Sequence, residues 1–296
     1  GAPAGSAGYR QTNGPPRCGR QGGNEMKTRI IVGVVCVPLL AVVVLLLPLW
    51  VLGLLMGALC AIAAWEFFRC VRPDAPVRMP AVCGAMAALI PISESLSPGG
   101  VWSYALFFCV MVYMFAELMV SFRGGKPLSF DLVAAGVLAG FAIPYFLTGI
   151  VRLGTMGRAF VVLPFLIAFA SDTGAYFAGV YLGRHKLAPV LSPHKTIEGS
   201  AGGFLATIAV LLIAGLVFRA LGYTVRFQVL AAYGLLGSLA CQFGDLSFSA
   251  IKRLSGIKDY GKIIPGHGGI LDRFDGMVFV AALSELLVTL VPAYFR

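Results

Sequence analysis

The chain has 296 residues, of which 58% are hydrophobic and only 12% are charged. An ordinary soluble domain has about a quarter of its residues charged, so this composition excludes that class and indicates a polytopic membrane protein. The weak alternating pattern of a membrane β-barrel is absent, so we expect an all-α bundle of membrane helices. The net charge of +10 has two explanations, a nucleic-acid partner or membrane orientation, and its distribution along the chain decides between them.

Residues 1–25 are rich in Gly, Pro and Arg and lack apolar periodicity, so we interpret them as a disordered leader or a non-native remnant. Met26 has the appearance of a natural start, and residues 26–296 are expected to form a single integral-membrane catalytic domain. The apolar run after Arg29 is too long for a cleaved signal peptide, and no small-residue cleavage site follows it. It is therefore predicted to be a retained membrane span.

Apolar stretches bounded by polar, Pro or Gly residues recur along the whole chain, and the third of them is the shortest. No internal repeat and no soluble domain interrupts the series. Because about 20 apolar residues cross the hydrocarbon core as a helix, we predict nine membrane helices. They cover residues 30–48, 51–68, 79–93, 101–122, 131–150, 159–182, 200–219, 227–250 and 275–294.

The basic residues are distributed unevenly between the two sides of the predicted membrane topology. With the N-terminus in the cytoplasm, 18 of the 23 Lys and Arg residues fall in cytoplasmic segments, and the ratio is still 15 to 5 without the leader. The positive-inside rule then places the loops 183–199 and 252–274 on the cytoplasmic face. Topology therefore explains most of the positive charge, and no motif supports a nucleic-acid partner.

The segment 244–275 contains many charged and polar residues in an otherwise apolar chain. Charge in apolar surroundings is costly and is retained mainly where it has a function, so this segment is the candidate site. Asp245 lies roughly 10 Å inside its span, and Asp272 and Asp275 open the next span on one helix face, which the hairpin brings against it. Asp172, in an earlier span, offers a fourth carboxylate, and four acids at one level suggest a hard cation such as Mg²⁺. The alternatives are that Asp245 pairs with Lys252 or a neighbouring arginine, and that Asp172 or Asp275 only orients its helix.

Basic residues and glycines between the last two predicted spans have the composition of a phosphate-binding segment. Ser249 shares a helix face with Asp245, and the glycines allow the backbone to approach a ligand closely. The alternative is that a basic loop in a membrane protein is only a topology signal. The candidate residues are Ser249, Lys252, Arg253, Lys258, Lys262, His267, Gly268, Gly269 and Arg273.

A second loop, residues 192–200, repeats this composition. Ser192, Lys195 and Thr196 are candidate phosphate or nucleotide contacts. An equally good explanation is a solvated turn in which Glu198 stabilises the dipole of the next helix.

Other polar residues give weaker signals. The seven cysteines lack metal-ligand spacing and are interpreted as small buried hydrophobes. Glu66 and Glu117 lie close enough to Arg69 and Arg123 for local pairing, and Glu285 receives no role.

The segment from Ser249 to Asp275 resembles the signature of the phosphatidate cytidylyltransferases, also known as CDP-diacylglycerol synthases: S-x-x-K-R, then K-D, then P-G-H-G-G-x-x-D-R-x-D. Segments 244–246, 171–173 and 192–199 are also similar to the family, so the resemblance is strong in the C-terminal half and rests on span number elsewhere. Every anchor of the signature is present: Ser249, Lys252, Arg253, Lys258, Asp259, Pro265, Gly266, His267, Gly268, Gly269, Asp272, Arg273 and Asp275.

The resemblance implies a Mg²⁺-dependent condensation of CTP with phosphatidic acid, giving CDP-diacylglycerol and pyrophosphate, with K⁺ as a candidate second cation. Asp245 and Asp272 match the family's metal ligands, with Asp275 and Asp172 close by. We hypothesise that Ser249, Lys252 and Arg253 hold the phosphatidate, that the loop lysines and His267 stabilise pyrophosphate, and that the acyl chains stay in the bilayer.

A bacterial inner-membrane location is expected, and a homodimer is left open. Two rival functions also remain. A CTP-dependent lipid-alcohol kinase would release CDP instead of pyrophosphate. A transporter would show repeat symmetry and broken helices near the membrane midplane.

Overall fold

The computed structural model describes residues 42, 46–123, 127–261 and 268–295 and is predominantly helical. Its helices are long and apolar, as the composition requires. In chain order they are α2 (Leu49–Val71), α3 (Arg78–Leu96), α4 (Val101–Arg123), α5 (Phe130–Val137), the π-helix η1 (Leu138–Ala142), α6 (Ile143–Leu147), α7 (Gly149–Met156), α8 (Arg158–Leu182), α9 (Ile197–Ala220), α10 (Phe227–Leu254) and α11 (Leu271–Leu290).

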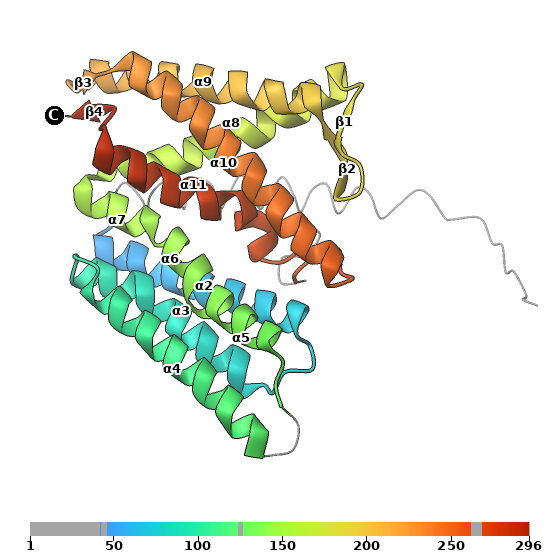
Figure 1. Ribbon diagram of the computed structural model, residues 1–296. Coiled ribbons are helices and arrows are strands. Elements are labelled where there is room, and N and C mark those ends of the chain that lie inside the picture. Colours follow the sequence, from blue (N-terminus) through green and yellow to red (C-terminus); the bar gives the residue numbers. More distant parts are fainter. Residues whose placement is uncertain (1–41, 43–45, 124–126, 262–267, 296) are drawn as a thin grey trace, which may run out of the picture.

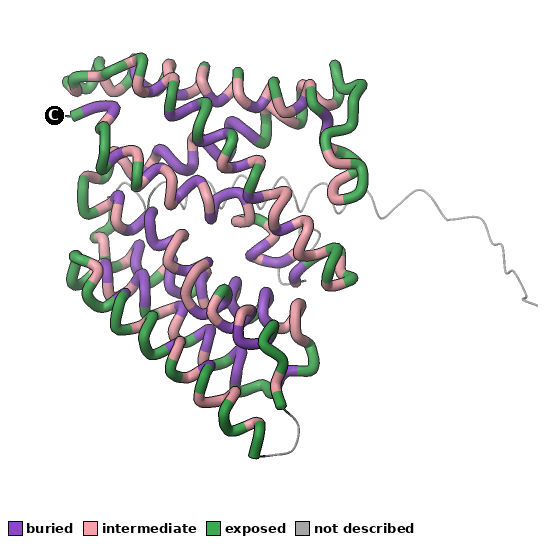
Figure 2. The backbone as a smooth tube through the Cα atoms, in the orientation of Figure 1, coloured by how far each residue is buried: buried purple, intermediate pink, exposed green. Residues whose placement is uncertain are grey.

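The helices form two groups, α2 to α7 and α8 to α11, which lie one below the other in Figure 1. α11 lies along the boundary, where it contacts α2, α6 and α7 of the first group and α8 and α10 of the second. Buried residues follow the facing sides of the helices, while α4 and the outer side of α9 are largely exposed (Figure 2). Exposed apolar faces on the outermost helices are what contact with lipid requires.

Seven helical segments of the described residues are long and apolar enough to cross a membrane: α2, α3, α4, the segment Phe130–Met156, α8, α9 and α10. This confirms an all-α polytopic membrane protein, whereas the predicted number of nine is not confirmed. The predicted span 30–48 lies almost entirely outside the described residues. The predicted span 275–294 corresponds to α11, which begins at Leu271 and is more polar because it carries Asp272, Arg273, Asp275 and Glu285.

The predicted span 131–150 is a composite of α5, η1, α6 and α7. Pro144 follows the π-helical turn, and a proline has no N–H to continue the regular helical bonding. The irregular turn therefore lies where the sequence itself interrupts the backbone ladder.

Two small antiparallel strand pairs were not predicted. β1 (Lys186–Ala188) pairs with β2 (Ser192–Thr196) in the loop before α9, with Lys186 opposite Thr196 and Ala188 opposite Ser192. β3 (Thr224–Val225) pairs with β4 (Tyr294–Phe295) and ties the end of the chain to the connection between α9 and α10. The β1–β2 hairpin is the strand pair that contributes residues to the site.

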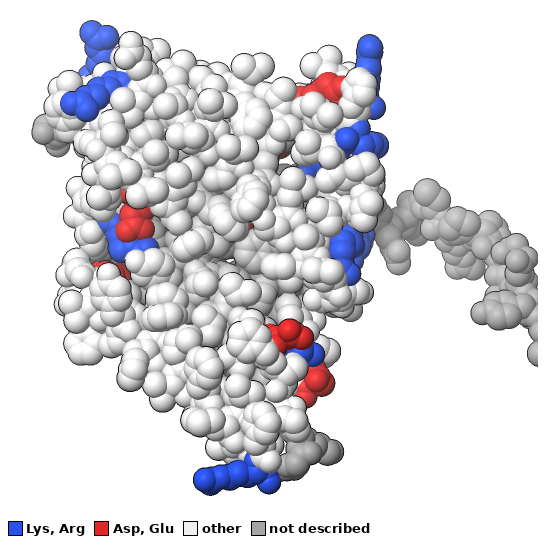
Figure 3. All heavy atoms as spheres, viewed as in Figure 1, with Lys and Arg blue, Asp and Glu red and all other residues white. Residues whose placement is uncertain are grey.

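Charged side chains on the face shown in Figure 3 gather near the ends of the helices, and the surface between them is largely uncharged. Figure 1 shows the β1–β2 hairpin, the end of α10 and the start of α11 at one end of the bundle, with β3 and β4 at the other. The segments predicted to be basic therefore meet at one end.

Close packing of α10 against α11 depends on Gly244 and Gly276. A Cβ at Gly244 would lie 2.8 Å from the Asp275 carbonyl oxygen, and one at Gly276 would lie 2.7 Å from Asp245 Oδ1 and 2.8 Å from Cys241 Sγ. Small residues allow membrane helices to approach at such crossings. This crossing brings the acidic residues of α10 and α11 together.

Candidate functional site

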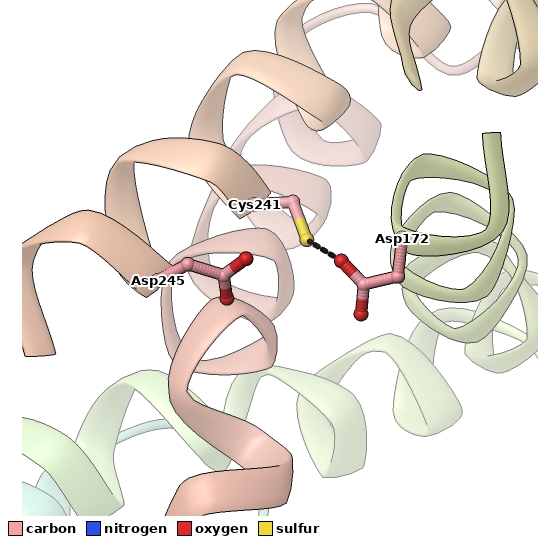
Figure 4. Close-up of side chains that lie close together, drawn as sticks. All are labelled: Asp172, Cys241 and Asp245. Atoms are coloured by element: carbon pink, nitrogen blue, oxygen red, sulfur yellow. Dashed lines mark hydrogen bonds between the residues drawn. The ribbon is translucent and has the colours of Figure 1, made fainter. Parts of the chain in front are cut away.

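Three potential ligand side chains from two helices converge at the basic end of the bundle. The ligand atoms of Asp172 on α8 and of Cys241 and Asp245 on α10 all lie within 4.8 Å of one another (Figure 4). The Cys241 thiol donates to Asp172 Oδ1 at 3.7 Å. Cys241 precedes Asp245 by four residues, so both side chains project from one face of α10.

The β1–β2 hairpin supplies a cation to this cluster. Lys195, on β2, donates from Nζ to Asp245 Oδ2 at 2.8 Å. The next residue, Thr196, is the N-cap of α9, and its side-chain oxygen accepts from Gly199 N–H at 3.1 Å. The cap fixes where the strand ends and the helix begins, and so fixes the position of Lys195.

A second cluster lies where α10 meets the start of α11. Lys252 Nζ donates to Asp272 Oδ1 at 2.9 Å and lies 3.6 Å from Asp275 Oδ2. Asp272 Oδ2 also accepts from the N–H groups of Tyr260 at 2.8 Å and Gly269 at 3.0 Å. Asp272 therefore binds the segment that joins the two helices at two points.

The two clusters are adjacent. Asp275 interacts electrostatically with Asp245, and Asp245 interacts in the same way with Asp172. The described residues thus place acids from α8, α10 and α11 side by side in space. Lys195 pairs with Asp245, and Lys252 lies between Asp272 and Asp275. The suggested alternative that Asp245 pairs with Lys252 is wrong, because Lys252 instead lies between Asp272 and Asp275.

Tyr260 lies in the connection between the helices and is almost fully buried. Burial, and then the charges of Asp275 and Asp272, raise the pKa of its phenol, so it stays neutral and donates to the Phe248 carbonyl at 3.1 Å. Lys252 Nζ lies 5.3 Å from the centroid of the Tyr260 ring. The ring therefore forms one wall around the lysine that holds the α11 acids.

A cavity of about 510 Å³ opens beside the first cluster. This volume falls in the range of small-molecule sites, about 300–1,000 Å³. The start of α9 forms part of its wall, and the exposed N–H groups of a helix start favour anions. The polar residues that line it are Asp172, Ser192, His194, Lys195, Thr196, Ser200, Gln242 and Asp245.

The remaining predicted phosphate contacts are dispersed around this end of the molecule. Arg253 is exposed and donates to the Leu191 carbonyl at 3.3 Å, which links α10 to the β1–β2 hairpin. Lys258 and Arg273 are exposed, Ser249 and Gly268 are half-buried, and Gly269 is buried. Lys262 and His267 lie outside the described residues.

Cys241 and Gln242 line the site although neither was predicted to be a site residue. Cys241 is buried, as predicted, but its thiol contacts Asp172 instead of only filling space. Gln242 Nε2 donates to the Ser200 carbonyl and to Ser238 Oγ, both at 3.2 Å, and its side chain lines the cavity. The helical spacing of Cys241 from Asp245 is the sequence signal that could have identified it.

The predicted local pairing of two glutamates is wrong. Glu117 binds Arg78, with Oε2 accepting at 2.7 Å, and Glu66 Oε2 accepts from the N–H of Leu271 at 2.9 Å. Glu285, which had no predicted role, forms an ion pair with Arg152 at 2.5 Å. Each partner comes from another helix, so short sequence spacing was misleading.

Comparison with known proteins gives a consistent result. The profile described as "Cytidylyltransferase family" matches residues 27–291. Phosphatidate cytidylyltransferase of Staphylococcus aureus strain COL is 46% identical over 132 residues, 45% of this chain and 50% of that protein. The proteins of the same name from Staphylococcus saprophyticus and Staphylococcus epidermidis strain RP62A are 42% and 46% identical over the same length and shares. The chain spans about half the length of these curated relatives.

Proposed function

We propose that this chain, which belongs to the cytidylyltransferase family, transfers the CMP moiety of CTP to phosphatidic acid, giving CDP-diacylglycerol and pyrophosphate. The observation that carries the proposal is the cavity lined by Asp172, Lys195 and Asp245 at the basic end of the helices. Acids beside lysines suit a nucleoside triphosphate with its divalent cation. The name shared by the relatives supports phosphatidate as the acceptor.

The donor set suits Mg²⁺, which takes carboxylate oxygens and substrate phosphates as ligands. We assign it to Asp172, Asp245, Asp272 and Asp275, with a monovalent cation such as K⁺ as a second occupant. The Cys241 thiol is too soft to serve as a Mg²⁺ ligand. When bound, Mg²⁺ would neutralise phosphate charge and help to orient the α-phosphorus of CTP.

Lys195 and Lys252 form ion pairs with aspartates in this structure, and each would bind a substrate phosphate in place of its aspartate. Lys195 lies at the cavity wall, where it pairs with Asp245, and Lys252 lies between Asp272 and Asp275. A bound triphosphate or lipid phosphate would offer each lysine another anionic partner. Ser192 and Thr196 lie beside Lys195 in the same cavity. For the lipid phosphate we assign Ser249, Lys252 and Arg253, and for the departing pyrophosphate Lys258, Lys262, His267, Gly268, Gly269 and Arg273.

The reaction needs alignment more than acid–base chemistry. An oxygen of the phosphatidate phosphate attacks the α-phosphorus of CTP, and a new P–O bond forms. The bond from the α-phosphorus to the bridging oxygen of the β-phosphate breaks, and pyrophosphate leaves with that electron pair. The attacking phosphate is already ionised, so no residue has to remove a proton from it.

The site is proposed to face the cytoplasm, where CTP is available. The excess of Lys and Arg in the segments that meet at this end supports that orientation by the positive-inside rule. The acyl chains would remain in the bilayer of a bacterial inner membrane while the headgroup reaches the acids.

The deciding experiment supplies purified full-length protein in detergent with CTP, Mg²⁺ and phosphatidic acid. We expect CDP-diacylglycerol and pyrophosphate in equal amounts. Diacylglycerol replaces phosphatidic acid in a control reaction and should give no product. Release of CDP with phosphorylation of a lipid alcohol would overturn the proposal in favour of a kinase.

A further inference from the structure

We propose that Glu66, on α2, is a positioning residue that fixes the start of α11 and thereby the location of Asp272 and Asp275. The role of those two aspartates in catalysis rests on the proposed function, whereas the contact between Glu66 and α11 does not. The contact itself crosses from the N-terminal helix group to the C-terminal group that carries the motif.

The central contact is a hydrogen bond between remote helices. Glu66 is 3% exposed, and its Oε2 accepts from the N–H of Leu271, the first residue of α11, at 2.9 Å. The first N–H groups of a helix have no partner within the helix, and Ile270, at the N-cap position, supplies no side-chain cap. Glu66 therefore caps α11 from outside, where the helix dipole also favours a negative charge.

The chain around Glu66 leaves room for its carboxylate. A Cβ at Gly269 would lie 2.5 Å from Glu66 Oε2 and 2.6 Å from Oε1, and Gly261 packs against the same carboxylate. Gly269 also donates its N–H to Asp272 Oδ2. Glu66 thus contacts the residues that immediately precede Asp272 in two places.

Two further residues of α2 hold the other segment that binds Asp272. The Cys70 thiol donates to the Tyr260 carbonyl at 2.7 Å, and the Phe67 ring lies 5.9 Å from the Tyr260 ring. The Tyr260 N–H in turn donates to Asp272 Oδ2 at 2.8 Å. One face of α2 therefore supports both backbone donors of the same carboxylate.

The cost of burying this acid favours such a role. Within the described residues Glu66 Oε1 has no hydrogen-bond partner, so the loss of hydration is only partly offset. An apolar residue would fill the space without that cost but could not accept the Leu271 N–H. A 1 Å displacement of a catalytic group lowers the rate roughly 10²-fold. The gain in rate from a fixed start of α11 therefore outweighs the loss of stability from burying the Glu66 carboxylate.

The test compares Glu66→Ala with Glu66→Gln, whose amide oxygen can still accept the Leu271 N–H. The matched control is Glu94→Ala, because Glu94 is also buried in the N-terminal helix group, with 2% of it exposed. Its carboxylate accepts from the Ser103 hydroxyl at 2.6 Å. Glu94 lies near the C-terminal end of α3, which is far from the start of α11 (Figure 1). We would measure amide hydrogen exchange across residues 268–276 of the full-length protein, thermal stability, and kcat as a function of Mg²⁺ concentration.

We expect Glu66→Ala to speed exchange across residues 268–276, lower kcat by roughly 10²-fold and raise the Mg²⁺ concentration for half-maximal rate. Glu66→Gln should restore slow exchange and most of kcat, and Glu94→Ala should change stability alone. Unchanged exchange in Glu66→Ala, or no rescue by Glu66→Gln, would overturn the inference. If wild-type protein forms no CDP-diacylglycerol, the proposed function fails while the exchange result still judges the role of Glu66 at α11.

Discussion

Lys195 and Asp245 form an ion pair across 50 residues of sequence, with Nζ and Oδ2 2.8 Å apart. The pair joins the β1–β2 hairpin to α10 at the wall of the cavity. It places a positive charge next to an acid that also interacts with Asp172 and Asp275. The cavity therefore has a lysine and carboxylates at one wall, which is the combination that the proposed function requires for phosphate and its cation.

Replacing Lys195 by Ala should lower kcat/KM for CTP by roughly 10²-fold, because the proposed function makes this ammonium group a preorganised donor to phosphate. The Lys195 and Asp245 side chains are 30% and 19% exposed, so water screens their ion pair. We therefore expect the free energy of unfolding to fall by only about 1 kcal/mol. Steady-state kinetics and thermal denaturation provide the two measurements. Lys186→Ala, an exposed residue of the same hairpin, is the control, and an equal loss there would count against a specific role for Lys195.

Asp245→Asn and Asp272→Asn should each raise the Mg²⁺ concentration required for half-maximal activity by at least about tenfold, equivalent to 1.4 kcal/mol of binding free energy. Each substitution removes a charged oxygen that the proposed function assigns to Mg²⁺, while the shape of the side chain is preserved. Asp74→Asn, in an exposed position between α2 and α3, should leave the Mg²⁺ curve unchanged. Near-normal rates at low Mg²⁺ in both site variants would end the metal assignment.

Cys241→Ser should retain most of the Mg²⁺-dependent activity, because the thiol is not a ligand for a hard cation. Cd²⁺ prefers sulfur, and the Cys241 thiol shares a 4.8 Å cluster with two carboxylates, so Cd²⁺ should inhibit wild type more strongly than the serine variant. Inhibition curves at fixed Mg²⁺ measure the difference. Identical curves would mean that Cd²⁺ acts elsewhere.

Gly276→Ala should reduce both stability and activity. The added Cβ would lie 2.7 Å from Asp245 Oδ1 and 3.1 Å from the Cys241 carbonyl oxygen, so α10 and α11 must separate, at a cost of about 1–3 kcal/mol. Gly140→Ala is the matched control, since its nearest neighbour would lie at an ordinary 3.4 Å. Thermal denaturation and CDP-diacylglycerol formation should show normal behaviour in the control only.

The sequence determined the class of fold and several helix boundaries. Residues 159–182 and 227–250 were predicted as spans, and α8 and α10 occupy Arg158–Leu182 and Phe227–Leu254. An apolar run of this length is transferred into lipid because of its own composition, so neighbours hardly matter. The spacing of Asp245, Ser249 and Lys252 along one helix face is equally local, as is the motif that led to the family.

Tertiary structure decided which charges meet. Lys195 is the partner of Asp245, Lys252 serves Asp272 and Asp275, and Glu66 reaches Leu271, which is 205 positions away in the sequence. For Asp245 and Glu66 the nearest oppositely charged residue in sequence was a poor guide, because helix crossings set which side chains approach. A buried charge binds whichever partner the packing brings within reach, and that geometry exists only after the helices have assembled.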